Sequence, residues 1–166
     1  MEKIDLREQG YFNYIKGKLL EMVVQNLFSR FNNETVAGFL FGQTEDIITP
    51  RFKIHGDLVI KLPTSGQYQI DAYGEYGQGN KHTIWVAECK YREAEPMNAG
   101  EVQKSLQAAQ AAKEARSASN MVIWLISTGG FTQDALALIE KNGFLHSAGE
   151  EINALAKEFG IDIKIA

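Results

Sequence analysis

The chain has one cysteine, few histidines and no long hydrophobic run. A single cysteine in 166 residues excludes a disulfide framework and a zinc site built from cysteines. The three histidines, His55, His82 and His146, do not have the spacing of metal ligands. No apolar run approaches the roughly 18–20 residues that a membrane-spanning helix needs, and no signal peptide is visible. We therefore expect a cytoplasmic protein with no membrane span.

The chain also lacks an excess of positive charge. Its 17 Lys and Arg residues and 21 Asp and Glu residues give a formal net charge of −4 at pH 7, whereas a dedicated nucleic-acid binder is often strongly basic. A nucleic-acid substrate is still compatible with this balance, because a divalent cation bound at an acidic site would reverse the local field. A partner subunit or a further domain can also supply affinity for DNA. The length and a hydrophobic content of 45% indicate one globular domain over residues 1–166.

The most hydrophobic strand-like stretch, Thr83–Arg92, ends on two charges of opposite sign. It begins as an apolar, β-rich run, which is typical of a strand buried on both faces. Because side chains alternate across a strand, Glu88 and Lys90 point to one side and Cys89 to the other. Burying a charge is costly unless the charge is paired or bound to a metal, so the pair indicates a functional site. We expect Cys89 to point into the core and to behave as a small hydrophobe.

A second strand-like run, Tyr68–Tyr73, precedes this stretch and is joined to it by the turn-rich segment Gly74–Lys81. The two runs can form an antiparallel hairpin, which places Asp71 across from Glu88 and Lys90. Two carboxylates with open coordination positions suit Mg²⁺, and a neighbouring lysine can orient a metal-bound water or help to deprotonate it. These are the groups that metal-assisted hydrolysis of a phosphodiester requires.

Asp71, followed by Glu88-Cys89-Lys90 on the next strand, resembles the D…(D/E)xK signature of the restriction-endonuclease-like nucleases. The segment Ile126–Ala135 is similar to the strand–helix turn of the Mrr-like branch, which reads roughly (S/T)(T/S)xxFTxxA. The resemblance covers about residues 17–144. It implies an α/β fold, a restriction-endonuclease-like three-layer sandwich with a mixed central sheet flanked by helices.

The resemblance also implies a Mg²⁺-dependent DNA endonuclease for restriction, defence or DNA processing, with Mn²⁺ able to replace Mg²⁺. Asp71, Glu88 and the main-chain carbonyl of Cys89 would be direct metal ligands. Lys90 would position the attacking water and stabilise charge on the phosphate, and cleavage would leave a 5′-phosphate. A homodimer would supply the two active sites that cutting both strands needs. RNA and branched DNA stay open as substrates, because nothing in the sequence selects the form of the nucleic acid.

Glu21 is the expected fourth member of the site. Residues 17–31 have apolar positions at helical spacing, and Glu21 falls at the border of the buried face. In the family, an acidic residue on this first helix often completes the metal site by holding a metal-bound water or a second ion. The alternative is a boundary glutamate in water. Asp57 is a competing carboxylate, although the pair Gly56-Asp57 is also typical of a turn.

Two further polar residues, Gln103 and Thr132, are expected beside the site in accessory roles. Gln103 falls in the first turns of a helix predicted over residues 99–118, and the alternative is that it belongs to a solvated helix face. Thr132, or Thr128 in the same turn, can donate a hydrogen bond to a phosphate at a helix N-terminus. The alternative for Thr132 is helix capping.

The remaining elements follow from periodicity and from capping residues. Asn98 and Glu101 form a predicted capping box. Residues 32–66 are predicted to be an insertion that contributes extra strands or a flap that contacts the substrate. The other predicted elements are a docking segment over 1–16, strands over 54–62, 121–126 and 161–165, and helices over 131–143 and 149–159.

A different class of function stays open, namely a module that keeps the nuclease fold without any chemistry. Such a module would bind nucleic acid or act as a scaffold in a larger assembly, and Glu88 and Lys90 would then form a structural ion pair. The acidic net charge favours the silent module, whereas the presence of all three signature residues favours the nuclease.

Overall fold

The computed structural model describes residues 6–165 of the chain, and side-chain environments from residue 10 onward. A central sheet has the strand order β3-β4-β5-β6-β7, and a separate two-stranded sheet pairs β1 with β2. The helices are α1 (Leu6–Arg30), α2 (Ala99–Ala115), α3 (Gln133–Asn142) and α4 (Gly149–Glu158), with the 3₁₀ helices η1 (Gly38–Phe41) and η2 (Gly79–Lys81). The strands are β1 (Thr35–Val36), β2 (Ile47–Ile48), β3 (Ile54–Lys61), β4 (Gln67–Tyr76), β5 (Thr83–Lys90), β6 (Asn120–Ser127) and β7 (Leu145–Ser147).

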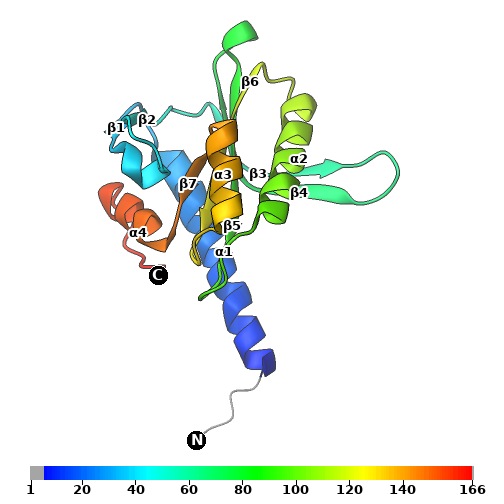
Figure 1. Ribbon diagram of the computed structural model, residues 1–166. Helices are drawn as coiled ribbons and strands as arrows, with labels where there is room; N and C mark the ends of the chain where they lie inside the picture. Colours follow the sequence, from blue (N-terminus) through cyan, green and yellow to red (C-terminus); the bar gives the residue numbers. More distant parts are fainter. Residues whose placement is uncertain (1–5, 166) are drawn as a thin grey trace, which may run out of the picture.

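The central sheet is mixed and has helices on both faces (Figure 1). Strands β3, β4 and β5 pair antiparallel, as the predicted hairpin requires, and β5, β6 and β7 pair parallel. The parallel strands are connected through α2 and α3, because a parallel pair needs a crossover. Helices α1 and α4 share one buried cluster with the sheet, and α2 and α3 share the other. The result is the predicted three-layer α/β sandwich.

Alternation along β5 divides its side chains between the two cores. Trp85 and Ala87 belong to the cluster under α1 and α4, whereas Ile84 and Val86 belong to the cluster under α2 and α3. A strand that is buried on both faces in this way reads as a continuous apolar run. The small side chains that α2 turns toward the sheet, such as Ala109, are fully buried, so this helix packs close to the strands.

The capping residues lie where the sequence predicts them. Asn98 accepts a hydrogen bond from the Glu101 main-chain N–H at 2.9 Å, and Glu101 accepts one from the Asn98 N–H at 3.2 Å, which completes the capping box. Thr132 caps α3 by accepting from the Ala135 N–H at 3.1 Å. Gly143 follows α3 with a φ of 68°, a left-handed conformation that glycine adopts without the steric cost that other residues meet.

Two predictions at the ends of the chain need correction. Helix α1 begins at Leu6, so residues 6–16 continue the first helix and are not a separate docking segment; residues 1–5 of that segment lie outside the described residues. Residues 161–165 form no strand, and the Ile165 N–H bonds the Asn153 side chain at 2.7 Å. The last strand is instead β7, whose three residues are too few to give a periodic pattern.

Residues 32–66 contain β1, η1, β2 and β3. Strand β3 forms one edge of the central sheet, and β1 and β2 pair with each other in a separate sheet, but that these strands are extra to the core fold stays a prediction. That the segment is an insertion stays a prediction. Among the described residues, no helix is long and apolar enough to cross a membrane.

Candidate active site

The site lies where β4 and β5 part. Their antiparallel ladder runs from Tyr76 opposite Thr83 to Ala72 opposite Ala87 and ends there. Beyond that point the Cys89 N–H donates to the Asp71 carboxylate at 2.9 Å. A side-chain oxygen therefore holds the two strands together where the main-chain ladder has ended, and it brings Asp71 next to the Glu88-Cys89-Lys90 motif, as the sequence predicts.

A β-bulge in β4 coincides with Asp71. Strand β3 pairs Gly56 with Tyr73 and Leu58 with Ile70, so two residues of β4, Asp71 and Ala72, lie opposite one residue of β3. A bulge of this kind disrupts the alternation of side chains and redirects one of them. Helix α1 holds the bulge in place, because the Gln25 side-chain amide donates to the Asp71 main-chain oxygen at 2.8 Å.

The residue of β3 opposite the bulge is Asp57, the competing carboxylate. Its side chain is exposed. The Gly56-Asp57 pair thus marks a strand irregularity, and Asp71 is the carboxylate that meets the Glu88 motif.

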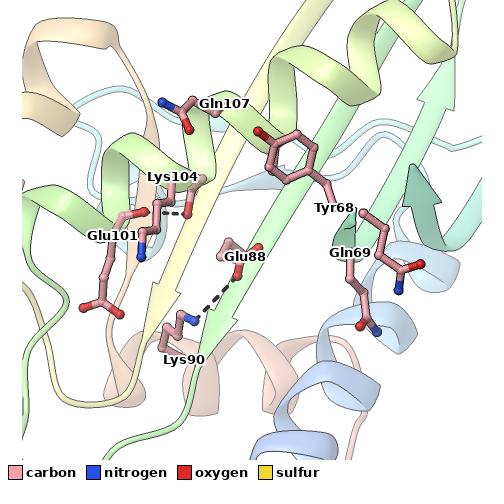
Figure 2. Close-up of a pocket in the computed structure, with 10 residues that line it drawn as sticks. Tyr68, Gln69, Glu88, Lys90, Glu101, Lys104 and Gln107 are labelled. Atoms are coloured by element: carbon pink, nitrogen blue, oxygen red, sulfur yellow. Dashed lines mark hydrogen bonds and ion pairs between the residues drawn. The ribbon is translucent and has the colours of Figure 1, made fainter. Parts of the chain in front are cut away.

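Glu88 and Lys90 point to the same side of β5, as alternation predicts, and Figure 2 shows them facing one another. The Lys90 Nζ and the Glu88 Oε1 are 3.9 Å apart, and the two side chains are 37% and 19% exposed. At this distance the ion pair is loose, so the ammonium keeps donors for other partners. Both residues line a pocket of about 450 Å³ between β4 and α2.

Cys89 points to the opposite side of β5, into the core under α1. Burial raises the pKa of its thiol well above the usual value, and the thiolate is the nucleophilic form of cysteine. The expected role as a small core hydrophobe is confirmed, and thiol chemistry at this position is disfavoured.

Both carboxylates of the site hold their protons more tightly than usual. Burial, together with the nearby carboxyl of Glu21, raises the pKa of Asp71 to about 6, against the lowering effect of the Cys89 N–H. Burial and the charge of Asp71 raise the pKa of Glu88 to about 8, and Lys90 offsets only part of this rise. One lysine is therefore not enough to keep both carboxyls ionised at neutral pH, and a bound cation would stabilise their charged forms.

Glu21 joins the site from α1. The charge of its carboxyl is one of the causes that raise the pKa of Asp71, and its Oε2 lies 3.2 Å from the Lys18 Nζ. Its side chain is 22% exposed, which agrees with the predicted position at the border of the buried face. Glu21 and Asp71 do not line the pocket between β4 and α2, so the four residues extend from that pocket to α1.

The donor set fits a hard divalent ion. Two carboxylates and the Cys89 main-chain carbonyl offer oxygen ligands, and Mg²⁺ is usually held by one or two carboxylates with the rest of its shell filled by water or substrate oxygens. Within residues 6–165, no three His, Cys, Asp or Glu side chains are arranged to hold a metal together. Direct coordination by Glu21 in addition to Asp71 and Glu88 therefore has no geometric support, whereas contact through water suits its position.

The predicted accessory residues differ in their placement. Gln103 is exposed and does not line the pocket. Thr132 uses its hydroxyl to cap α3. Thr128 accepts from the Arg92 N–H and donates to the Arg92 carbonyl, both at 2.8 Å, so it ties the exit of β6 to the exit of β5. The accessory roles of Gln103 and Thr132 stay predictions.

Sequence reasoning missed the face of α2 that lines the pocket. Glu101, Lys104, Ser105 and Ala108 line it, and these positions follow the i, i+3, i+4, i+7 spacing of one helix face. That spacing is readable in the sequence once the helix is known to start beside the end of β5.

Glu101 has a structural partner. Arg92 forms a two-pronged salt bridge with it, with the Nη1–Oε1 contact at 2.8 Å and a second contact between Nη2 and Oε2. This pairing lowers the pKa of the Glu101 carboxyl and raises that of the Arg92 guanidinium. The salt bridge fixes the start of α2 against the segment that follows β5.

A buried carboxylate outside the site, Glu75, lies at the other end of the same hairpin. It is 3% exposed. The His82 Nε2 lies 3.0 Å from its Oε1, and Arg116 contacts its Oε2 through Nε at 3.0 Å and Nη2 at 2.9 Å. Here a buried charge has dedicated partners, and its role is structural.

No family model matches the chain, and the search of curated proteins finds no match either. Solved structures do resemble it. A protein of unknown function, AF1548, has a TM-score of 0.56 at 12% identity, over 87% of this chain and 67% of that one. The restriction endonuclease MspJI, solved with a 27-mer oligonucleotide, has a TM-score of 0.52 at 12% identity, over 90% of this chain and 30% of that one. At such identities the likeness concerns the fold alone, and it agrees with the topology described above. The chain has a restriction-endonuclease-like fold.

Proposed function

We propose that this protein is a Mg²⁺-dependent endonuclease of the Mrr-like branch that hydrolyses phosphodiester bonds of DNA, with Mn²⁺ able to substitute. One observation supports the proposal above all others. Asp71 and Glu88 are largely buried carboxylates at the point where β4 and β5 part, both with raised pKa values, and Lys90 is beside them. Groups whose pKa values are perturbed by burial and by specific neighbours are concentrated at functional sites.

Each residue has a role that its environment supports. Asp71, Glu88 and the Cys89 carbonyl would hold the ion, which would polarise the phosphate and lower the pKa of a bound water. The Asp71 carboxylate is fixed by the Cys89 N–H, so its position does not depend on the ion. Lys90, which is only loosely paired with Glu88, can donate to the attacking water or to a phosphate oxygen. Glu21, beside Asp71, would orient a water.

The test is plasmid cleavage and metal binding with matched variants. Wild-type protein is expected to nick supercoiled DNA with Mg²⁺ or Mn²⁺, and to bind Mn²⁺ in a calorimetric titration. Asp71→Asn and Glu88→Gln should lose both properties while circular dichroism shows an intact fold. Asp57→Asn is the control, because it removes an exposed carboxylate on the neighbouring strand. A wild type that neither cuts DNA nor binds Mn²⁺ would favour the silent module, in which Glu88 and Lys90 are a structural ion pair.

A homodimer in the cytoplasm belongs to the same proposal. The first part of α1 extends away from the body of the molecule (Figure 1). It exposes Phe12 (54%), Ile15 (36%), Leu19 (37%) and Met22 (55%), whose spacing of 3, 4 and 3 residues is that of the a and d positions of a coiled coil. A second copy of α1 offers the same row by symmetry.

Sedimentation analysis tests the dimer. Phe12→Asp should shift the protein from dimer to monomer, whereas Val59→Asp, at a 46% exposed apolar residue of β3, should not. A monomeric wild type at concentrations where it cuts both strands would contradict the dimer and leave the nuclease assignment intact.

A further inference from the structure

The pocket beside Glu88 and Lys90 extends well beyond the two charged groups. It runs between β4 and α2, and its volume of about 450 Å³ is in the range of sites that hold small organic ligands. In Figure 2, Tyr68 and Lys104 lie on either side of Glu88, and Gln69 and Gln107 lie farther along β4 and α2. Gln67, Ser105 and Ala108 complete this part of the lining.

The pocket lining has too few positive charges for a surface that binds along the phosphates of a DNA duplex. Lys90 and Lys104 are its cations, and a surface that follows duplex phosphates uses many more, since each neutralised phosphate adds to affinity. Of its carboxylates, Glu101 is already paired with Arg92. The rest of the lining is neutral and consists of amide side chains, a phenol and small residues.

Neutral side chains of these kinds contact nucleobases in proteins that bind nucleic acids. A glutamine amide can form two hydrogen bonds with the edge of one base. Aromatic side chains stack with bases that are unpaired. Tyr68 packs partly against the core under α2, so its ring is held in place on one side. Ser105 and Ala108 are buried and small, which leaves room between α2 and β4 where longer side chains would fill the gap.

We propose that this pocket binds one unpaired nucleobase of the DNA substrate, next to the phosphate that is cut. Tyr68 provides the stacking surface, Gln107 bonds the base edge, and Lys104 contacts the adjoining phosphate. A base that is stacked and paired in a duplex cannot enter the pocket. The substrate class is therefore DNA with a single-stranded gap or an extruded nucleotide at the cut site. This inference deepens the proposed nuclease function and rests on it for cleavage, but the preference in binding does not need catalysis.

Binding is measured first, so that chemistry does not interfere. Fluorescence anisotropy with the Asp71→Asn protein in EDTA compares a fully paired duplex with the same duplex carrying a three-nucleotide gap. We expect the gapped DNA to bind about tenfold more tightly. A 2-aminopurine placed in the gap should change its fluorescence on binding, since it leaves its neighbours and contacts Tyr68.

Substitutions in the pocket test which residues cause the preference for gapped DNA. Tyr68→Ala and Gln107→Ala should remove most of the preference for gapped DNA, whereas Tyr68→Phe should keep it. Gln110→Ala is the matched control, because Gln110 is an exposed glutamine on the same helix and does not line the pocket. Thermal unfolding of each variant verifies that the fold is intact.

The outcomes separate the inference from the nuclease assignment. Equal affinity for paired and gapped DNA, or an unchanged preference in Tyr68→Ala, would overturn the base pocket even if wild type cuts duplex DNA with Mg²⁺. A preference that depends on Tyr68, in a protein whose wild type cuts no DNA, would support the pocket and contradict the nuclease assignment.

Discussion

The two ends of the β4–β5 hairpin differ in how well the charges of their buried carboxylates are balanced by partners. At the turn end, Glu75 is 3% exposed and lies between His82 and Arg116. At the open end, Asp71 and Glu88 share a single loosely paired lysine, and Glu21 adds a third carboxylate. The same hairpin thus carries one buried charge whose partners balance it and one cluster whose partners do not.

This difference distinguishes a structural ion pair from a candidate functional site. A buried ion pair with complete partners contributes to the fold, and removing one partner is costly. A cluster of like charges without compensation costs stability, so its presence indicates a ligand or a reaction that uses it. The comparison predicts that substitutions at the two ends affect different measurable properties.

The largest effect is expected on cleavage at the open end. Lys90→Ala should lower the rate of Mg²⁺-dependent DNA cleavage at least about hundredfold, because the attacking water and the phosphate charge lose their donor. Arg116→Ala, at the turn end, should leave the cleavage rate of the folded protein nearly unchanged. Single-turnover plasmid nicking measures both. If both variants lose activity equally, the assignment of chemistry to the open end fails.

The next effect concerns stability at the turn end. Glu75→Gln should lower the free energy of unfolding by about 3 kcal/mol, because it leaves His82 and Arg116 without their buried partner. Glu88→Gln, measured at pH 8.5 without metal, should leave the protein as stable as wild type or more stable, since it removes a largely buried charge that Lys90 compensates only in part. Urea unfolding measures the two changes, and the reverse order would contradict the comparison.

The pH dependence of stability should also reveal the carboxyls at the open end of the hairpin. The folded protein raises the pKa of Asp71 from 3.8 to about 6 and that of Glu88 from 4.5 to about 8. It therefore holds protons that the unfolded chain has released, and the stability from these groups is full below about pH 4 and is lost as the pH rises toward 8.

Thermal unfolding without metal measures this dependence. The melting temperature of the wild type should fall between pH 5 and pH 9 more steeply than that of Glu88→Gln. The lowered pKa of Glu101 acts in the opposite direction, but it acts below about pH 4.5. Parallel curves for wild type and Glu88→Gln would show that Glu88 is not the source of the slope.

The smallest expected effects concern the accessory residues. Thr132→Ala should cost about 1 kcal/mol of stability through the lost cap of α3, and Gln103→Ala, at an exposed position, should change stability little. If both variants keep wild-type cleavage rates, capping and a solvated helix face explain these two residues. A loss of cleavage in a stable Thr132→Ala protein would instead support contact with the phosphate.

The sequence predicts the features of this fold that depend on local pattern. The apolar runs of β5 and β6, the turn-rich link that makes the hairpin, and the Asn98–Glu101 capping box each give a signal within a short window. The placement of Asp71 against the Glu88 motif follows from pairing those two strands.

Other features depend on contacts that a single sequence does not display. The bulge at Asp71 arises from its pairing with β3, and the partners of Glu75 come from two separate segments. The start of α1 could not be predicted from the sequence pattern. The aromatic residues Tyr11 and Phe12 are exposed, so this part of the helix lacks the amphipathic pattern of a helix that packs on a core.

The most direct test of the account is an anomalous difference map from crystals soaked in MnCl₂. The account predicts a peak about 2.1 Å from carboxylate oxygens of both Asp71 and Glu88, close to the Cys89 main-chain carbonyl. A map of well-ordered, Mn²⁺-soaked crystals with no peak between these two side chains would contradict it.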